Sequence, residues 1–127
     1  EAWPFRRTLA LRPASGGRRT VLRLPLRPEA GQVLQTAVGV HPEKWFQMPS
    51  FATHFGIAIV SPEARESVYA RSLNPHEDFG DRRWFDVEIP LDRWAGREIQ
   101  LELSVAVDSE QGESLLVGGF AVPRLLD

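Results

Sequence analysis

The side chains that could carry chemistry in this sequence are three histidines, 17 acidic residues and four tryptophans. His41, His54 and His76 form none of the HxH, HxxxH or HExxH spacings that hold zinc. The chain has no cysteine, which excludes disulfides, thiolate nucleophiles and zinc–thiolate sites. It also lacks G-x-S-x-G and G-x-G-x-x-G. No single motif therefore specifies a reaction.

Acidic residues gather in the segment "EDFGD". Glu77, Asp78 and Asp81 place three carboxylates in one expected loop, and carboxylates with backbone carbonyls are the ligands that calcium prefers. The spacing matches no defined calcium loop, so a solvated acidic loop is the alternative. We therefore expect no cofactor other than a structural calcium at this loop.

Aromatic residues give the more useful signal, because sugar rings stack their apolar faces on aromatic side chains. Trp45 and Phe46 fall in the longest stretch without alternation, and binding residues concentrate in such loops. Trp84 falls on the polar phase of its expected strand, beside Arg82 and Arg83. An outward Trp84 could form a stacking platform; cover by a loop or by a neighbouring domain is the alternative.

Period-two alternation of apolar and polar residues dominates the chain and predicts half-buried antiparallel strands. In the clearest example Ile99, Leu101, Leu103 and Val105 alternate with polar residues. The expected strands are Phe5–Leu11, Thr20–Leu26, Val33–Val40, Phe55–Val60, Ser67–Leu73, Phe85–Leu91, Ile99–Val107 and one within Leu115–Val122.

Turn signals separate these strands. "PASGG", "RPEAG" and "DSEQGES" are interpreted as hairpin loops, and "SPEARES" and "NPHEDFGD" as further connections. "LDRWAG" is expected to form a tight turn or a short 3₁₀ element, with Gly96 in an unusual backbone conformation fixed by Asp92 and Trp94. About eight short strands without a long helix predict an all-β fold, an antiparallel β-sandwich of the jelly-roll kind.

The composition narrows the class of partner. A net charge of −2 gives no nucleic-acid footprint, and no apolar run is long enough to insert this segment into a membrane. The basic residues are 14 arginines and one lysine, a bias of the whole chain that marks no site. The length fits one domain, residues 1–127, which we expect to be excised from a longer protein.

Three segments resemble a known group of domains. "DRRWFDVEIPLDRWAGREIQLEL", "LQTAVGVHPEKW" with "HFGIAIVSP", and the closing "GGFAVPRLL" resemble galactose-binding-like β-sandwich domains. The likeness is nearest to the carbohydrate-binding-module-type accessory domains of bacterial sulfatases and cell-surface glycan enzymes. Phe120 departs from the group, which more often has Trp near the closing proline.

The resemblance implies a non-catalytic carbohydrate-binding or glycan-enzyme-associated module in an extracytoplasmic, periplasmic or cell-surface location. Its partners would be an oligosaccharide and a neighbouring catalytic domain. One alternative is a structural or protein-interaction domain that packs against an enzyme or mediates assembly, and another is a small hydrolase on the same scaffold. The candidate ligand residues are Trp45, Phe46, His54, Arg71, Asp81, Arg82, Arg83 and Trp84.

Overall fold

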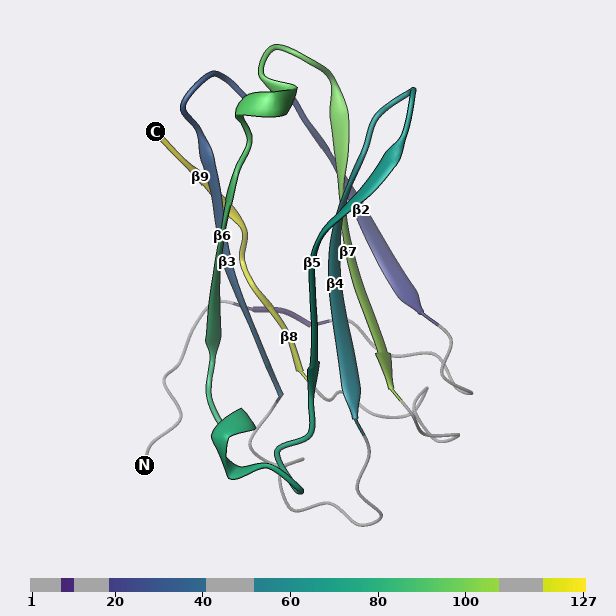
Figure 1. Ribbon diagram of the computed structural model, residues 1–127, viewed down its shortest axis with the longest axis vertical. Helices are drawn as coiled ribbons and strands as arrows, with labels where there is room; N and C mark the ends of the chain where they lie inside the picture. The colour runs from purple at the N-terminus through teal and green to yellow at the C-terminus, as the bar shows by residue number, and fades with distance from the viewer. Residues whose placement is uncertain (1–7, 11–18, 41–51, 108–117) are drawn as a thin grey trace.

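The computed structural model describes residues 8–10, 19–40, 52–107 and 118–127. These residues form two antiparallel sheets packed face to face, which confirms the predicted β-sandwich (Figure 1). The strands are β1 (Thr8–Ala10), β2 (Thr20–Leu26), β3 (Val33–Val40), β4 (Thr53–Val60), β5 (Arg65–Leu73), β6 (Phe85–Pro90), β7 (Ile99–Val107), β8 (Gly118–Ala121) and β9 (Arg124–Leu126).

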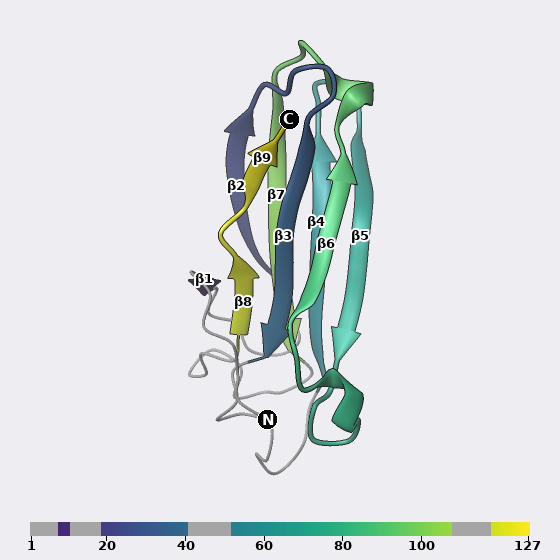
Figure 2. The same cartoon turned by 90° about the vertical axis from the view of Figure 1, so that its left-hand side faces the viewer.

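The first sheet has the strand order β1-β8-β3-β6, with β9 also pairing with β3. Figure 2 shows this sheet in front, with β9 following β8 along the same side of β3. The interruption between β8 and β9 falls at Val122 and Pro123. Proline has no N–H to give to a ladder. Thr36 of β3 donates its hydroxyl to the Ala121 carbonyl at this break.

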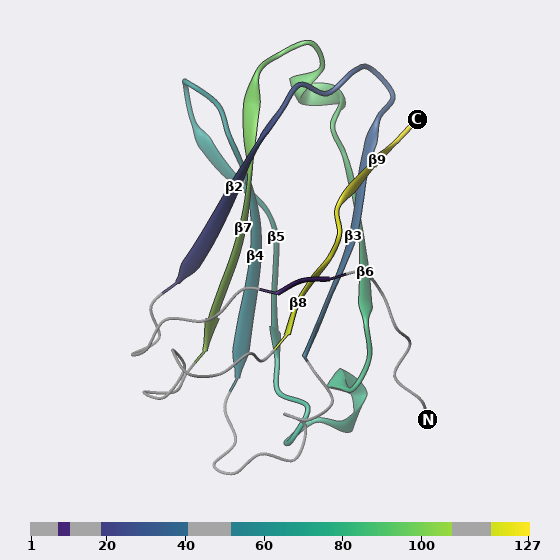
Figure 3. The same cartoon turned by 180° about the vertical axis from the view of Figure 1, so that it is seen from behind.

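The second sheet has the strand order β2-β7-β4-β5 and lies behind the first in Figure 2. Its central pair, β4 and β7, runs in register from Thr53 opposite Val107 to Val60 opposite Gln100. The view from behind shows β2 on one margin of this sheet and β5 on the other (Figure 3).

Most connections pass from one sheet to the other, which corrects the prediction of hairpin loops. "RPEAG" joins β2 of the second sheet to β3 of the first. "PASGG" and "DSEQGES" lie outside the described residues, but the described strands on either side of each, β1 and β2, and β7 and β8, belong to different sheets. Turn-forming residues reverse the chain, but they do not decide which strand the next one pairs with. Among the strands that the structure describes, β4 and β5 are joined as a hairpin, through "SPEA".

The core lies between the sheets and follows the predicted alternation. On β7 the residues Ile99, Leu101, Leu103 and Val105 are all buried against the opposite sheet. Phe120 from the first sheet is fully buried and meets Phe55 of the second edge to face, with ring centroids 5.7 Å apart. These contacts fix how the two sheets lie on one another.

A short 3₁₀ turn, η3 (Asp92–Trp94), confirms the prediction for "LDRWAG". Gly96 has a φ of 76°, a conformation that glycine adopts without a steric cost. Asp92 accepts a hydrogen bond from the Gly31 amide at 2.7 Å, and Trp94 is buried. The turn thus ties two connections between the sheets together at the upper end in Figure 1.

Candidate functional site

The β5–β6 connection holds four of the predicted ligand residues, and their side chains mostly organise the connection itself. Asp81 accepts a hydrogen bond from the Asn74 amide at 2.9 Å, and Arg82 donates to the Pro75 carbonyl at 2.7 Å. The Arg83 guanidinium lies 4.0 Å from the centre of the Phe85 ring. These contacts position the connection around the 3₁₀ turn η2 (Phe79–Asp81).

Trp84 is covered. It is only 6% exposed and stands immediately before β6. The strand begins at Phe85, so the pleat that sets side-chain direction does not extend to residue 84. Trp84 is therefore a covered residue and not a stacking platform, and its ring has no open face for a sugar. Trp45 and Phe46 lie outside the described residues.

The predicted calcium ligands make loop contacts of their own. Asp78 accepts a hydrogen bond from the Gly80 amide at 2.9 Å, which caps η2. In the ranges that the structure describes, no group of three or more acidic or histidine side chains is arranged to hold a metal. The calcium site stays a prediction.

His54 on the inner strand β4 and Arg71 on the edge strand β5 lie near one another in the second sheet. Both border a shallow depression of about 370 Å³ over β4 and β5. His54 and Ser72 lie opposite one another, and the His54 Nδ1 is 2.6 Å from the Ser72 hydroxyl oxygen. The Arg71 guanidinium lies 4.2 Å from the centre of the Phe85 ring, toward the other sheet. His54 therefore presents its ring beside the depression, whereas Arg71 mainly supports its edge.

A β-bulge shapes this depression. Ile57 pairs with Tyr69 but Ala58 pairs with Ser67, so Val68 is an extra residue in β5. A bulge changes the side-chain phase of a strand. As a result Ser67 and Ser72, on either side of the bulge, point to the same outer face of the second sheet.

The floor is built from small side chains. The outward positions of β4, β5 and β7 include Gly56, Ala58, Ala70 and Ser104. A Cβ atom on Gly56 would lie 2.7 Å from the Ser104 hydroxyl oxygen and 3.8 Å from a terminal nitrogen of Arg19. Glycine therefore keeps the floor low and leaves room beneath the Arg19 guanidinium.

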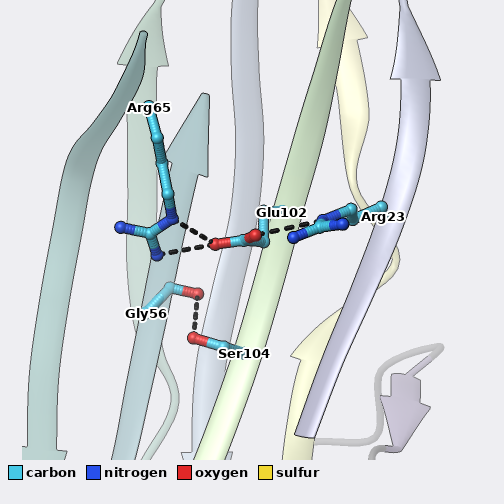
Figure 4. Close-up of polar contacts among 5 residues, drawn as sticks. All are labelled: Arg23, Gly56, Arg65, Glu102 and Ser104. Carbon is cyan, nitrogen blue, oxygen red and sulfur yellow. Dashed lines mark hydrogen bonds and ion pairs between the residues drawn. The ribbon is translucent and has the colours of Figure 1, made fainter. Parts of the chain in front are cut away.

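A carboxylate on the same outer face is almost wholly covered. Glu102 of β7 is 3% exposed and forms ion pairs with an arginine on each side (Figure 4). Arg65 donates to its Oε2 through Nε at 2.8 Å and lies within 2.6 Å of it through Nη2. Arg23 donates to its Oε1 at 3.2 Å. The ion pairs join three strands, β2, β7 and β5, across the middle of the sheet.

Glu102 stays charged because these hydrogen bonds outweigh its burial. Burial raises the pKa of Glu102, but the hydrogen bonds from Arg65 and then Arg23, with the charges of both, lower the pKa overall. The Arg65 and Arg23 side chains are themselves 47% and 59% exposed. Their outer surfaces therefore face solvent while their inner nitrogens are held in place.

The pattern of the sequence identified only part of this site. Glu102 stands on the polar phase of its strand, where an acid is normally solvated, and its partners are 79 and 37 residues away. Phe79 was also missed: it is 76% exposed at the tip of η2, with the Arg82 guanidinium 4.6 Å from its ring centre. The sequence could have predicted this depression from Gly56 and Ala58, because both are small residues at outward positions of an expected strand.

Replacing Gly56 by alanine is expected to destabilise the protein by about 1–3 kcal/mol, because the new methyl group overlaps the Ser104 hydroxyl. The Gly56→Ala/Ser104→Ala double variant removes the atom that is overlapped and should recover most of the loss. Urea denaturation of both variants and of Ser104→Ala alone measures the coupling. Equal losses in the single and double variants would contradict the packing described for this floor.

Comparison with protein-family models and with solved structures gives no match for this chain. An uncharacterized protein of Archaeoglobus fulgidus is 27% identical over 71 residues, a segment that covers 56% of this chain and 18% of that protein. Within the described ranges, no helix is long and apolar enough to cross a membrane.

Proposed function

We propose that this domain is a non-catalytic carbohydrate-binding or glycan-enzyme-associated module, and that it binds oligosaccharide on the outer face of the second sheet. The observation that carries the proposal is the depression over β4 and β5, with its small-residue floor and polar rim. The rim provides His54, Arg65, Ser67 and Ser72, which together can donate to and accept from sugar hydroxyls. A galactose-binding-like module in an extracytoplasmic location is the corresponding assignment.

The form of the depression suits a chain of sugars better than a small apolar ligand. Pockets for small molecules are usually concave and mainly apolar. Here polar side chains share the lining with apolar ones, and ion pairs with Glu102 hold the Arg23 and Arg65 guanidinium groups in place (Figure 4). Planar guanidinium groups that are fixed in advance lose little side-chain freedom when a ligand binds.

The order of strand pairing supports the jelly-roll interpretation. β1 pairs with β8, β2 with β7, β3 with β6 and β4 with β5, so the pairs are nested around the β4–β5 hairpin. A long hairpin folded over on itself into two sheets has this nesting, and lectin domains are among the proteins built in this way.

A binding role agrees better than a hydrolytic one with the groups at the depression. Among the described residues that line the depression, His54 and Ser72 bring a ring nitrogen and a hydroxyl oxygen within 2.6 Å of one another, and none of these lining residues is an aspartate or a glutamate. A serine nucleophile needs a base, a group that orients the base and donors for the oxyanion. We therefore assign the His54–Ser72 pair to hydroxyl recognition.

A packing role against a neighbouring catalytic domain is the second candidate. It is favoured by three exposed apolar side chains near the C-terminal strand, Val122, Leu125 and Leu126. Exposed apolar residues at the edge of a sheet can be covered by a neighbouring domain. This edge belongs to the first sheet, so the two roles are compatible in one domain.

The test is a titration of the ¹⁵N-labelled domain with neutral and sulfated oligosaccharides, with and without calcium, followed by amide chemical shifts. Saturable shifts on β4, β5 and β7 are expected. A calcium-dependent change at Asp78 and Asp81 would support the predicted metal site.

A further inference from the structure

We infer that the outer face of the second sheet selects acidic oligosaccharides, and that Arg19, Arg23 and Arg65 recognise their sulfate or carboxylate groups. This inference rests on the proposed function and adds a ligand class to it. It is carried by the charges on the two outer faces of the sandwich and by the way Glu102 holds two of the arginines.

The charges on the outer face of the second sheet are unbalanced. Arg23 and Arg65 share the single carboxylate of Glu102, which leaves one net positive charge on this triad. Arg19 adds a second, because a terminal nitrogen of its guanidinium stands above Gly56 and it has no carboxylate partner in the described part of the chain. The chain as a whole carries a net charge of −2, so this face opposes the average of the molecule.

The outer face of the first sheet has the reverse character. A depression of about 580 Å³ there is lined by Asp86 and Glu88 on β6, with Arg124 as its cationic residue. Arg124 donates to the Gln35 side chain at 2.6 Å. The charges of the described residues therefore favour an acidic ligand on the outer face of the second sheet over the outer face of the first.

Glu102 fixes the orientation of the Arg23 and Arg65 guanidinium groups and neutralises only one of their two positive charges. It occupies the Nε and one terminal nitrogen of Arg65 and the Nε of Arg23. Each guanidinium has five N–H donors, so donors remain on the solvent side of both groups. Guanidinium groups bind sulfate and carboxylate through paired N–H donors, and they bind best when their orientation is already fixed.

The small floor lets an acidic sugar reach these donors. Gly56 and Ala58 keep the strand surface low between Arg19 and Arg65. Hydroxyl-binding groups at His54 and Ser72 lie along the same strands. A saccharide on the floor can thus place its ring near the hydroxyl groups and its charged substituent near the arginines. An acidic peptide satisfies only the second condition.

Calorimetric titration tests the selectivity with matched ligands. The probes are two carrageenan tetrasaccharides that differ in sulfation, each compared with its own desulfated form, which is neutral, together with inorganic sulfate and hexaglutamate at equal ionic strength. We expect at least one sulfated tetrasaccharide to bind at least tenfold tighter than its desulfated form and also tighter than inorganic sulfate or hexaglutamate. Equal affinity for the two forms, or tighter binding of hexaglutamate, overturns the inference.

Variants locate the charge recognition. Arg19→Gln leaves the Glu102 ion pairs intact and should weaken binding of the sulfated tetrasaccharide at least fivefold, with the desulfated form unaffected. Arg65→Gln should also weaken binding of the sulfated tetrasaccharide. Circular dichroism checks that this variant is folded. Arg124→Gln removes the same charge from the opposite sheet and should change nothing. Equal weakening by Arg19→Gln and Arg124→Gln would show a general charge effect and overturn the inference.

The outcomes separate this inference from the proposed function. If both forms of a tetrasaccharide bind equally on the second sheet, the selectivity fails and the binding function stands. If no oligosaccharide binds to a folded sample, the proposed function itself fails, and the inference with it.

Discussion

Replacing Arg23 and Arg65 together by methionine is expected to lower the free energy of unfolding by about 3 kcal/mol at pH 7. The double variant leaves the Glu102 carboxylate covered and without its two cationic partners. Removing the partners of a covered charge is costly because the remaining charge has lost both water and its hydrogen bonds. We take a value at the low end of the usual range, because the arginine heads are half-exposed and water can partly replace them.

The pH dependence identifies the carboxylate as the cause. In the native protein the pKa of Glu102 is lowered from 4.5, so its stabilising effect is complete above pH 4.5 and is lost as the pH falls through the folded-state pKa. In the double variant burial acts on Glu102 without the arginines and raises the pKa of Glu102. The loss of unfolding free energy is therefore present at neutral pH, where Glu102 is charged, and disappears in acid, where Glu102 is protonated. Urea denaturation should therefore show the two proteins converging below about pH 4.

The control for this variant is Arg93→Met, because Arg93 forms a more exposed ion pair with Glu66 at 2.9 Å. Arg93→Met should lower the free energy of unfolding by less than about 1 kcal/mol. If the double variant loses no more unfolding free energy than Arg93→Met, and if that loss does not change with pH, then Glu102 is solvated in the folded protein. That result would contradict the arrangement in Figure 4.

Replacing Phe120 by alanine is expected to cost about 4 kcal/mol, because the side chain is fully buried between the two sheets. The change removes the edge-to-face contact with Phe55 and leaves a cavity where the sheets meet. A domain of this size has only about 5–15 kcal/mol of stability, so a large part of it would be lost. Thermal and urea denaturation measure the change.

A neighbouring substitution supplies the comparison. Val122 follows on the same segment but is 40% exposed, and Val122→Ala should cost about 0.5 kcal/mol or less. Similar small effects at both positions would contradict a core position for Phe120. The buried Phe120 thus joins the two sheets.

The strands were largely predictable, because alternation reports directly which side of a strand is buried. Thr20–Leu26, Val33–Val40 and Ile99–Val107 begin and end where the pattern places them. Which strands pair with one another was not predictable, because most paired strands are far apart in the sequence. Turn residues also do not determine which sheet the next strand joins. β9 was missed because Arg124–Leu126 is three residues long and follows a proline.

The candidate site was predicted only where the signal is local. His54 was identified from its residue type and position, and the structure places it beside the depression. Glu102, Arg23 and Arg65 resemble any solvated charges in the sequence, because their function as a unit depends on three strands meeting. The bulge at Val68 reverses the phase of β5, so simple alternation from Ser67 also misplaces Ser72.

The most direct measurement of the central claim is the amide shift map of the ¹⁵N-labelled domain during oligosaccharide titration. Tryptophan fluorescence is less suitable, because Trp84 and Trp94 are both buried. We predict saturable shifts centred on Gly56, Ser72 and Ser104, from the three strands that form the floor and its edge. Shifts confined to the Asn74–Trp84 connection, or no shifts from a folded sample across the whole panel, would contradict binding on the outer face of the second sheet.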